Sequence, residues 1–313
     1  MKNLKPFFPF VFSTASLLIE KLLENGKNST EKPYFLYFLA ILTIMLFLTG
    51  VASIFFKKLK DTMSFKSAFW SGVIAFITLY NVLTAKLNAL PMIFFPSPSR
   101  IIGVLVEDSA LIGKCVAYSS RLLFTGFLGG AIIGIIAGIA IGFSKKAAYW
   151  LVPLERFLGP IPSTAWIPIV LVVFPDTVSA SSFLIGLAVW FPTTLMTSSG
   201  INNISKSFFE VSETLGANTF QKIFKVGLPA AMPSIFIGIF NGTCSAFITL
   251  MTAEMIGAKY GIGWYVNWQK EMMSYSNVYA GLLVIAVTFS ILITLLFKVK
   301  DKILVWQKGV IKW

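Results

Sequence analysis

The sequence predicts an all-α fold, a polytopic membrane helix bundle of about seven transmembrane helices. Hydrophobic residues make up 56% of the 313-residue chain and charged residues only 12%, and the mean hydropathy is +0.80. A soluble domain of this length could not remove so much apolar surface from water. Apolar runs long enough to cross a membrane follow one another, and one longer polar segment, residues 207–233, stands between two of them.

The charge distribution orients the bundle. The formal net charge is +13, and the lysines and arginines stand mainly in the connections, where they favour the cytoplasmic side. After residue 56, alternate connections carry four, three, three and five of them, fifteen in all, against five on the other side (Arg100, Lys114, Arg121, Lys259 and Lys270). We therefore expect the segment 207–233 and the C-terminus in the cytoplasm, and no nucleic-acid partner.

The residue inventory excludes several chemistries. Histidine is absent and there are two cysteines, Cys115 and Cys244. Histidine-based metal sites and Ser–His or Cys–His catalysis are therefore excluded. We expect no catalytic residue, no metal and no cofactor, and we interpret both cysteines as small buried residues.

Residues 1–66 are predicted to be an N-terminal extension with one transmembrane helix, residues 34–56, which ends in a cytoplasmic lysine cluster. An earlier apolar run, residues 7–19, is shorter than the roughly 20 residues that a crossing needs. It is either a signal-like anchor or an interfacial helix, and the second is favoured. With seven spans the N-terminus begins outside, unless this run also crosses.

The next two spans carry distinct signals. In residues 68–90, Lys86 lies near the outer end and is expected to snorkel toward the headgroups. Residues 101–118 are expected to form an amphipathic helix at the outer interface. The span 122–143 has a glycine at every fourth position (Gly126, Gly130, Gly134, Gly138 and Gly142). These glycines share one helix face, which predicts a tightly packed helix pair in the bundle core.

The fourth and sixth spans are the predicted pathway-lining elements. Three prolines head the fourth span (Pro160, Pro162 and Pro168), and irregular backbone is tolerated at membrane depth against protein or a water-filled cavity. An ordinary proline-started helix is the equal alternative. The sixth span, residues 234–256, is polar for its position; its hydroxyls could contact a solute, although helix packing is their commoner use. The candidate lining residues are Pro162, Trp166, Pro168, Asn241, Ser245, Thr249 and Glu254. Glu254 is expected at the outer interface.

The segment 207–233 is predicted to form two short helices joined at an angle, as a docking surface. Ser207 and Glu210 have the spacing of a capping box that starts the first helix near Phe208, and Gly216 ends it. Asn218 with Gln221 repeats the start signal more weakly. The second helix then runs to about Val226, before a glycine and two prolines (Gly227, Pro229 and Pro233) interrupt it.

These residues carry a family resemblance. Glu210, Gly216, Val226, Leu228 and Pro229 resemble the EAA loop of binding-protein-dependent ABC importer permeases, whose pattern is Glu-Ala-Ala, three residues, Gly, nine residues, Ile, one residue, Leu-Pro. The spacing agrees throughout. The departures are Val211 and Ser212 for the alanines and Val226 for isoleucine. The glycine repeat, Pro160-Ile161-Pro162 and Ala253-Glu254-Met255-Ile256-Gly257 look like the nitrate, sulfonate and taurine branch, from about residue 68 to the C-terminus.

The resemblance implies a permease domain over residues 67–313, with a coupling loop at 201–233, in a bacterial-type cytoplasmic membrane. It implies a dimer of this permease, an external solute-binding protein and two copies of an ATPase subunit. The chain lacks the Gly-x-x-x-x-Gly-Lys-Ser/Thr phosphate loop, so ATP hydrolysis is expected from the partner and not from this chain. The implied contact residues are Glu210, Val211, Ser212, Leu215, Gly216, Ala217, Val226, Leu228 and Pro229.

Two other classes share the composition. An ion-coupled secondary transporter or channel usually places ionisable groups at mid-membrane, but Lys86 and Glu254 each lie toward one end of a predicted span. An intramembrane enzyme would need a nucleophile with a base, or paired acids, and none is suitably placed. The importer permease is therefore the favoured function, and the transported solute is not identified.

Overall fold

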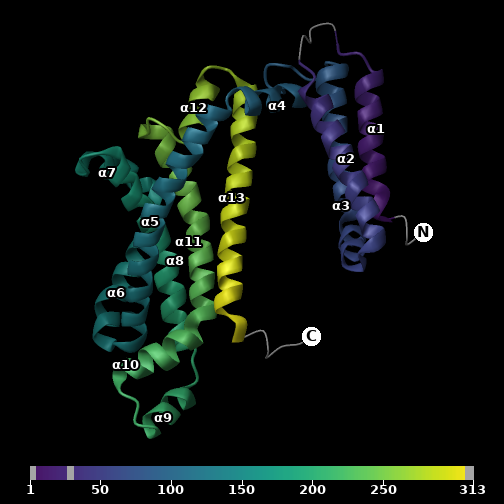
Figure 1. Cartoon of the computed structure of the whole chain (residues 1–313). Helices are drawn as coiled ribbons and strands as arrows, with labels where there is room; N and C mark the ends of the chain where they lie inside the picture. Colours follow the sequence, from purple (N-terminus) through teal and green to yellow (C-terminus); the bar gives the residue numbers. More distant parts are fainter. Residues whose placement is uncertain (1–4, 27–31, 307–313) are drawn as a thin grey trace. The chain divides into compact units, whose positions relative to one another are not determined.

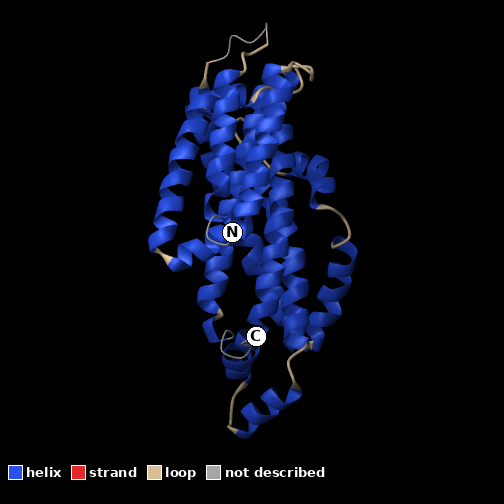
Figure 2. Ribbon diagram, turned by 90° about the vertical axis from the view of Figure 1, so that its right-hand side faces the viewer, coloured by secondary structure: helices blue, strands red, loops and turns tan. Residues whose placement is uncertain are grey.

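The computed structural model describes residues 5–26 and 32–306. The described residues form helices and no strand (Figure 2). Six helices are long and apolar enough to cross a membrane, and a further pair, bent by 85°, makes up to seven. This confirms the predicted fold class. The chain divides into two compact units, residues 1–111 with 269–282, and residues 112–268 with 283–313.

The first unit contains a bundle of three helices, α1 (Phe8–Leu22), α2 (Tyr34–Phe55) and α3 (Lys57–Asn81). They lie side by side (Figure 1). Ser13 Oγ is 2.6 Å from Thr43 Oγ1, and Ser16 Oγ is 2.5 Å from Thr78 Oγ1. Hydroxyl pairs therefore attach α1 to both neighbours, so residues 7–19 pack along two candidate spans, which does not agree with the interfacial helix expected for them.

Lys86 ends a π-helical turn, Val82–Lys86, that continues α3. The predicted snorkelling is wrong. The Lys86 side chain is 3% exposed and its Nζ lies 3.1 Å from Glu20 Oε2. The same Nζ donates to the carbonyls of Glu20 and Leu23 and to Asn25 Oδ1. Lys86 thus caps the C-terminus of α1, where backbone carbonyls lack helical partners and a cation is favoured.

We expect Lys86→Met to destabilise the protein by about 3–5 kcal/mol, because it leaves the Glu20 carboxylate buried without its cation. Thermal unfolding of the purified chain in detergent measures the effect. The double variant Lys86→Met/Glu20→Gln should recover most of the loss. Equal unfolding temperatures for wild type and Lys86→Met would show that the ion pair contributes nothing.

The connection between the units differs from the prediction of one amphipathic helix at 101–118. A short helix, α4 (Pro98–Glu107), starts at Ser97, whose Oγ accepts from the Arg100 amide. A second helix, α5 (Ser109–Phe143), then runs for 35 residues. The predicted third span therefore begins thirteen residues too late, because polar residues in the outer half of α5 resemble a connection.

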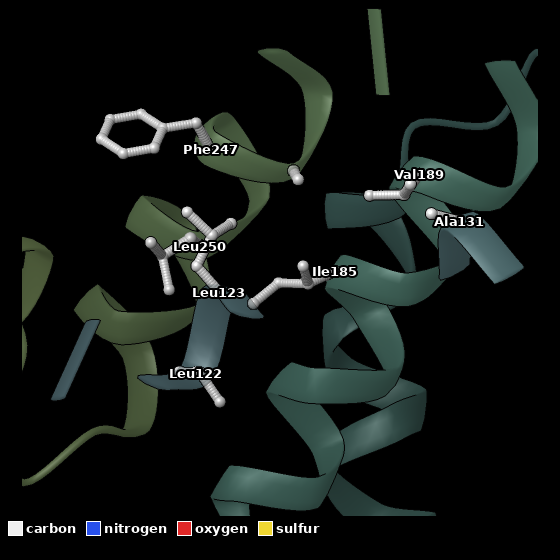
Figure 3. Packing of buried hydrophobic residues seen from close by; sticks show 8 residues of the cluster. Leu122, Leu123, Ala131, Ile185, Val189, Phe247 and Leu250 are labelled. Carbon is white, nitrogen blue, oxygen red and sulfur yellow. The ribbon is translucent and has the colours of Figure 1, made fainter. Parts of the chain in front are cut away.

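The second unit continues with α6 (Lys145–Leu158), α7 (Ile167–Val173), α8 (Thr177–Asn202), α9 (Lys206–Thr214), α10 (Thr219–Gln221), α11 (Leu228–Gly257), the first part of α12 (Ile262–Glu271) and the last part of α13 (Tyr275–Ile303). Its core joins α5, α8 and α11 (Figure 3). Leu122, Ile185, Val189 and Leu250 are each at most 3% exposed. At the N-cap of α8, the Ser179 amide and hydroxyl donate to Asp176 and lower the pKa of that carboxyl.

The glycine face of α5 lies against α8, as the four-residue repeat predicts. An added Cβ on Gly126 or Gly142 would lie 2.6–2.8 Å from Ile185 or Ile201 side-chain atoms. At Gly130 it would overlap the backbone of Gly186. The residue numbers of the contacting positions increase in the same direction along both helices, so α5 and α8 run parallel. The chain must therefore return across the bundle between them, through α6 and α7.

Candidate functional site

The first short helix of the segment 207–233 is α9, Lys206–Thr214, and it begins without a side-chain cap. The capping box predicted from Ser207 and Glu210 is wrong: the N-cap is Ser205, and the Ser207 hydroxyl lies 2.8 Å from the Ser205 hydroxyl. Glu210 is exposed. Its carboxylate is therefore available to a partner and does not start the helix.

An exposed apolar stripe follows α9. Phe208, Val211 and Leu215 are 62%, 58% and 82% exposed, and their spacing of three and four residues places them on one helix face. Ser212, on the other face, is buried and donates to the Phe209 carbonyl. An exposed apolar stripe on a helix outside the membrane spans is typical of a protein interaction surface.

Gly216 closes α9 as predicted. Its φ is +76°, a left-handed conformation that glycine adopts without steric cost. The Gly216 amide donates to the Glu213 carbonyl and the Ala217 amide to the Ser212 carbonyl, both at 2.9 Å. These two bonds are the Schellman pattern, which satisfies carbonyls at the end of a helix.

The second short helix starts with the capping box that the sequence predicted more weakly. Asn218 Oδ1 accepts from the Gln221 amide, and Gln221 Oε1 accepts from the Asn218 amide. Across the turn, Lys222 Nζ lies 2.6 Å from Glu213 Oε1. This ion pair links the two short helices on either side of Gly216.

The predicted interruption after Val226 is absent. A π-helical turn, Lys222–Gly227, connects α10 directly to α11, so one helical rod runs from Thr219 to Gly257. Pro229 lies just after the π-helical turn, at the junction with α11, where it cannot donate a backbone hydrogen bond. Val226 and Leu228 flank Gly227 within this rod, and Pro233 lies inside α11.

Phe143, a residue that the sequence did not single out, joins this segment to the bundle. Its ring centroid lies 5.8 Å from that of Phe209 on α9. A Cβ added to Gly227 would overlap the same ring. The end of α5 therefore contacts both short helices. Only the position of Phe143, directly before the cytoplasmic turn, could have indicated this contact.

The second part of the site is a cavity of about 370 Å³ at the break between α6 and α7. The predicted fourth span is not one helix. α6 occupies what was predicted to be a cytoplasmic turn, and α7 has seven residues, about 10 Å against a hydrocarbon core of roughly 30 Å. The break itself contains Gly159, Pro160 and Pro162 and then a 3₁₀ turn, Ser163–Trp166.

The cavity lining is uncharged and comes from the end of α6, the break with its 3₁₀ turn, α8 and α11. The lining residues are Leu158, Gly159, Ile161, Pro162, Ser163, Thr164, Leu187, Ala188, Trp190, Phe191, Pro192, Ser245, Ile248 and Thr249. Ser163 Oγ lies 2.6 Å from Thr249 Oγ1, which joins the break to α11. Pro192 inside α8 cannot donate to the Ala188 carbonyl. The cavity lining thus contains hydroxyl groups together with Ala188, whose carbonyl receives no hydrogen bond from residue 192.

The seven candidate lining residues do not all reach this cavity. Pro162, Ser245 and Thr249 line it. Asn241 is exposed on α11, one turn before Ser245. Trp166 packs instead against a cluster with Ile167, and Pro168 is exposed on α7. Ser163 and Pro192 were not predicted, although a proline inside an apolar run was an available signal.

Glu254 lies elsewhere. The Glu254 carboxylate, which was expected at the outer interface, is not exposed there: its side chain is fully buried within the second unit. The Ser119 hydroxyl and the Gly263 amide donate to its two oxygens.

Comparison with known proteins finds one family model that matches residues 130–304, described as "Binding-protein-dependent transport system inner membrane component". The chain is 32% identical over 236 residues to the putative aliphatic sulfonates transport permease protein SsuC of Bacillus subtilis, covering 74% of this chain and 85% of SsuC. It is 27% identical over 224 residues to the taurine transport system permease protein TauC of Escherichia coli, covering 69% of this chain and 81% of TauC.

A solved structure has the same fold. The inward-facing MetNI methionine ABC transporter matches with a TM-score of 0.53 and 17% identity, over 62% of this chain and 97% of the MetNI chain. At this identity the match establishes the arrangement of helices alone.

Proposed function

The chain belongs to the family of binding-protein-dependent transport system inner membrane components, and we propose that residues 201–233 couple it to a cytoplasmic ATPase. As a member of this family it is a multi-pass integral membrane protein of the inner membrane and the permease subunit of an ABC importer. It forms the translocation pathway for a small solute and works with a separate ATPase subunit. An ion-coupled carrier is not favoured.

The exposed stripe on α9 carries this proposal. Phe208, Val211 and Leu215 offer an apolar surface outside the membrane, and Gly216 with the Glu213–Lys222 ion pair sets the angle to the next helix. Because α10, the π-helical turn and α11 form one rod, a movement of the docked segment tilts α11 as a rigid body. We assign ATP hydrolysis to the partner, in two copies, one for each permease of a homodimer.

Binding of the partner ATPase subunit tests the docking surface. Leu215→Glu places a charge on the most exposed residue of the stripe, and we expect it to reduce co-purification with the ATPase at least tenfold, the effect of roughly 1.4 kcal/mol. Val305→Glu, which alters another exposed apolar residue beyond α13, is the matched control. Undiminished binding by Leu215→Glu would place the docking surface elsewhere.

Glu210 supplies a separate prediction. Since its carboxylate does not cap α9, its contribution is expected to be a direct charge contact with the ATPase. Glu210→Gln and Glu210→Ala should therefore reduce ATP-driven transport to a similar degree. A much milder effect of glutamine than of alanine would instead indicate that the side chain acts inside the helix.

The cavity at the α6–α7 break is the proposed solute path. Ser163, Ser245 and Thr249 supply hydroxyls there, and Asn241 extends the polar face of α11 toward the cytoplasm. We place this face at the interface between two copies of the permease, where residues from both would enclose the solute. The relatives' names give aliphatic sulfonates and taurine. We propose a small polar solute, delivered by an external binding protein.

Residues 1–66, with α1 and α2, are proposed as an addition to the permease domain of residues 67–313, and they pack against α3. α1 runs antiparallel to α2 in the three-helix bundle (Figure 1). If α2 ends at the cytoplasmic lysines, Lys57 and Lys58, then α1 begins on the same side. We therefore propose that the start of α1 faces the cytoplasm, the alternative to the external start expected from seven spans.

A further inference from the structure

Glu254 connects three helices at the outer end of the second unit. Its side chain is completely buried. Ser119 Oγ, on α5, donates to Glu254 Oε1 at 2.6 Å, and the Gly263 amide donates to Oε2 at 2.8 Å. Ser119 Oγ in turn accepts from the Ile262 amide at 2.9 Å. None of the ion pairs found among the described residues includes Glu254.

These contacts form a helix cap that is supplied from outside the helix. α12 begins at Ile262, and the first amides of a helix have no partner within it. Ser119 satisfies the first of these amides and Glu254 the second. An acidic group is also favoured at a helix N-terminus by the macrodipole. The cap explains how a carboxylate is accommodated in the bundle without a cation.

The turn before α12 has no space for side chains against this carboxylate. Gly261 has φ +147°, and a Cβ there would lie 2.7 Å from both carboxylate oxygens of Glu254. A Cβ on Gly263 would lie 2.6 Å from the Met251 carbonyl. The backbone thus approaches Glu254 as closely as glycine permits, and the position of α12 depends on that of α11.

We infer that Glu254 is a positioning residue that makes the start of α12 follow the outer end of α11, so that events outside the membrane reach the ATPase. A movement of α12 is passed to α11 through the contacts of Glu254 with Ser119 and Gly263. The helical rod then carries it from Gly257 back to Thr219, next to the α9 stripe. α12 lies in the connection between α11 and α13, residues 258–274. This inference rests on the proposed function, because it assumes an external binding protein and a cytoplasmic ATPase.

Two measurements on the full chain test the inference. Hydrogen exchange of the permease alone, in nanodiscs, should show the Ile262 and Gly263 amides exchanging about tenfold faster in Ser119→Ala and Glu254→Gln than in wild type. In the complex with ATPase, stimulation of ATP hydrolysis by solute-loaded binding protein should fall about tenfold in both variants, while basal hydrolysis stays unchanged. Ser120→Ala, the same substitution at the next position of α5, should behave as wild type.

The outcomes separate the inference from the proposed function. Unchanged exchange in both variants, or faster exchange with normal stimulation, would overturn the positioning role of Glu254. Loss of stimulation together with loss of basal hydrolysis would also overturn it, since that pattern indicates damage to the whole complex. A wild-type complex that no binding protein stimulates would count against the proposed function, and exchange would still show whether Glu254 holds α12.

Discussion

Replacing Gly130 by valine should prevent the permease from forming a stable bundle. A Cβ at Gly130 would lie 2.8 Å from the Cα and 2.9 Å from the carbonyl carbon of Gly186, and backbone atoms inside a helix cannot rotate away. Overpacking of a core costs about 1–3 kcal/mol when side chains can adjust. Here the helices α5 and α8 must separate, so we expect a loss at or above roughly 3 kcal/mol.

Gly129 is the matched control, because a Cβ there meets nothing within 4 Å. Gly129→Val should give normal yields of monodisperse protein after detergent extraction, whereas Gly130→Val should aggregate or unfold at a much lower temperature. Similar behaviour of the two variants would show that the α5–α8 contact is not as close as the structure describes.

The second large effect is expected at Gly216. Valine at this position must adopt φ +76°, which for a β-branched residue costs at least about 1–2 kcal/mol. The Schellman bonds at the end of α9 would then be distorted, and the angle between the two short helices would change. We expect Gly216→Val to reduce ATP-driven transport at least tenfold.

An asparagine variant tests whether the angle between the helices matters or glycine itself is required, since asparagine tolerates the left-handed conformation. Gly216→Asn should therefore retain much of the transport activity. Normal transport by Gly216→Val with the ATPase bound would show that Gly216 is only a replaceable helix end and does not set the angle for coupling.

Local sequence patterns correctly predicted those features that depend on residues close together in the sequence. The glycines of α5 recur at helical spacing, and their lack of a side chain is what permits the close approach to α8. Gly216 and the Asn218–Gln221 box depend on neighbours within five residues. The same reasoning failed at Ser207 and Glu210, because α9 begins at Lys206 and its N-cap is Ser205. These two residues have the spacing of a capping box, but they lie inside the helix.

The errors at Lys86 and Glu254 have another cause. Lys86 is paired with Glu20, 66 residues away, and Glu254 with Ser119, 135 residues away. A snorkelling lysine and an interfacial carboxylate are the reasonable expectations for isolated spans. Neither side chain is exposed as expected, because tertiary packing brings a distant partner to each of them. The cavity was predicted in part, since Pro162 and Thr249 reach it, but Ser163 joins it only through the bend between α6 and α7.

Uptake into proteoliposomes tests the central claim most directly, which is that this chain moves a solute when a partner hydrolyses ATP. The system contains the permease, its partner ATPase and its binding protein, with the solute that this binding protein retains. We predict uptake only with ATP and a hydrolysis-competent ATPase, and none with Leu215→Glu. Uptake driven by an ion gradient without ATP would contradict the account.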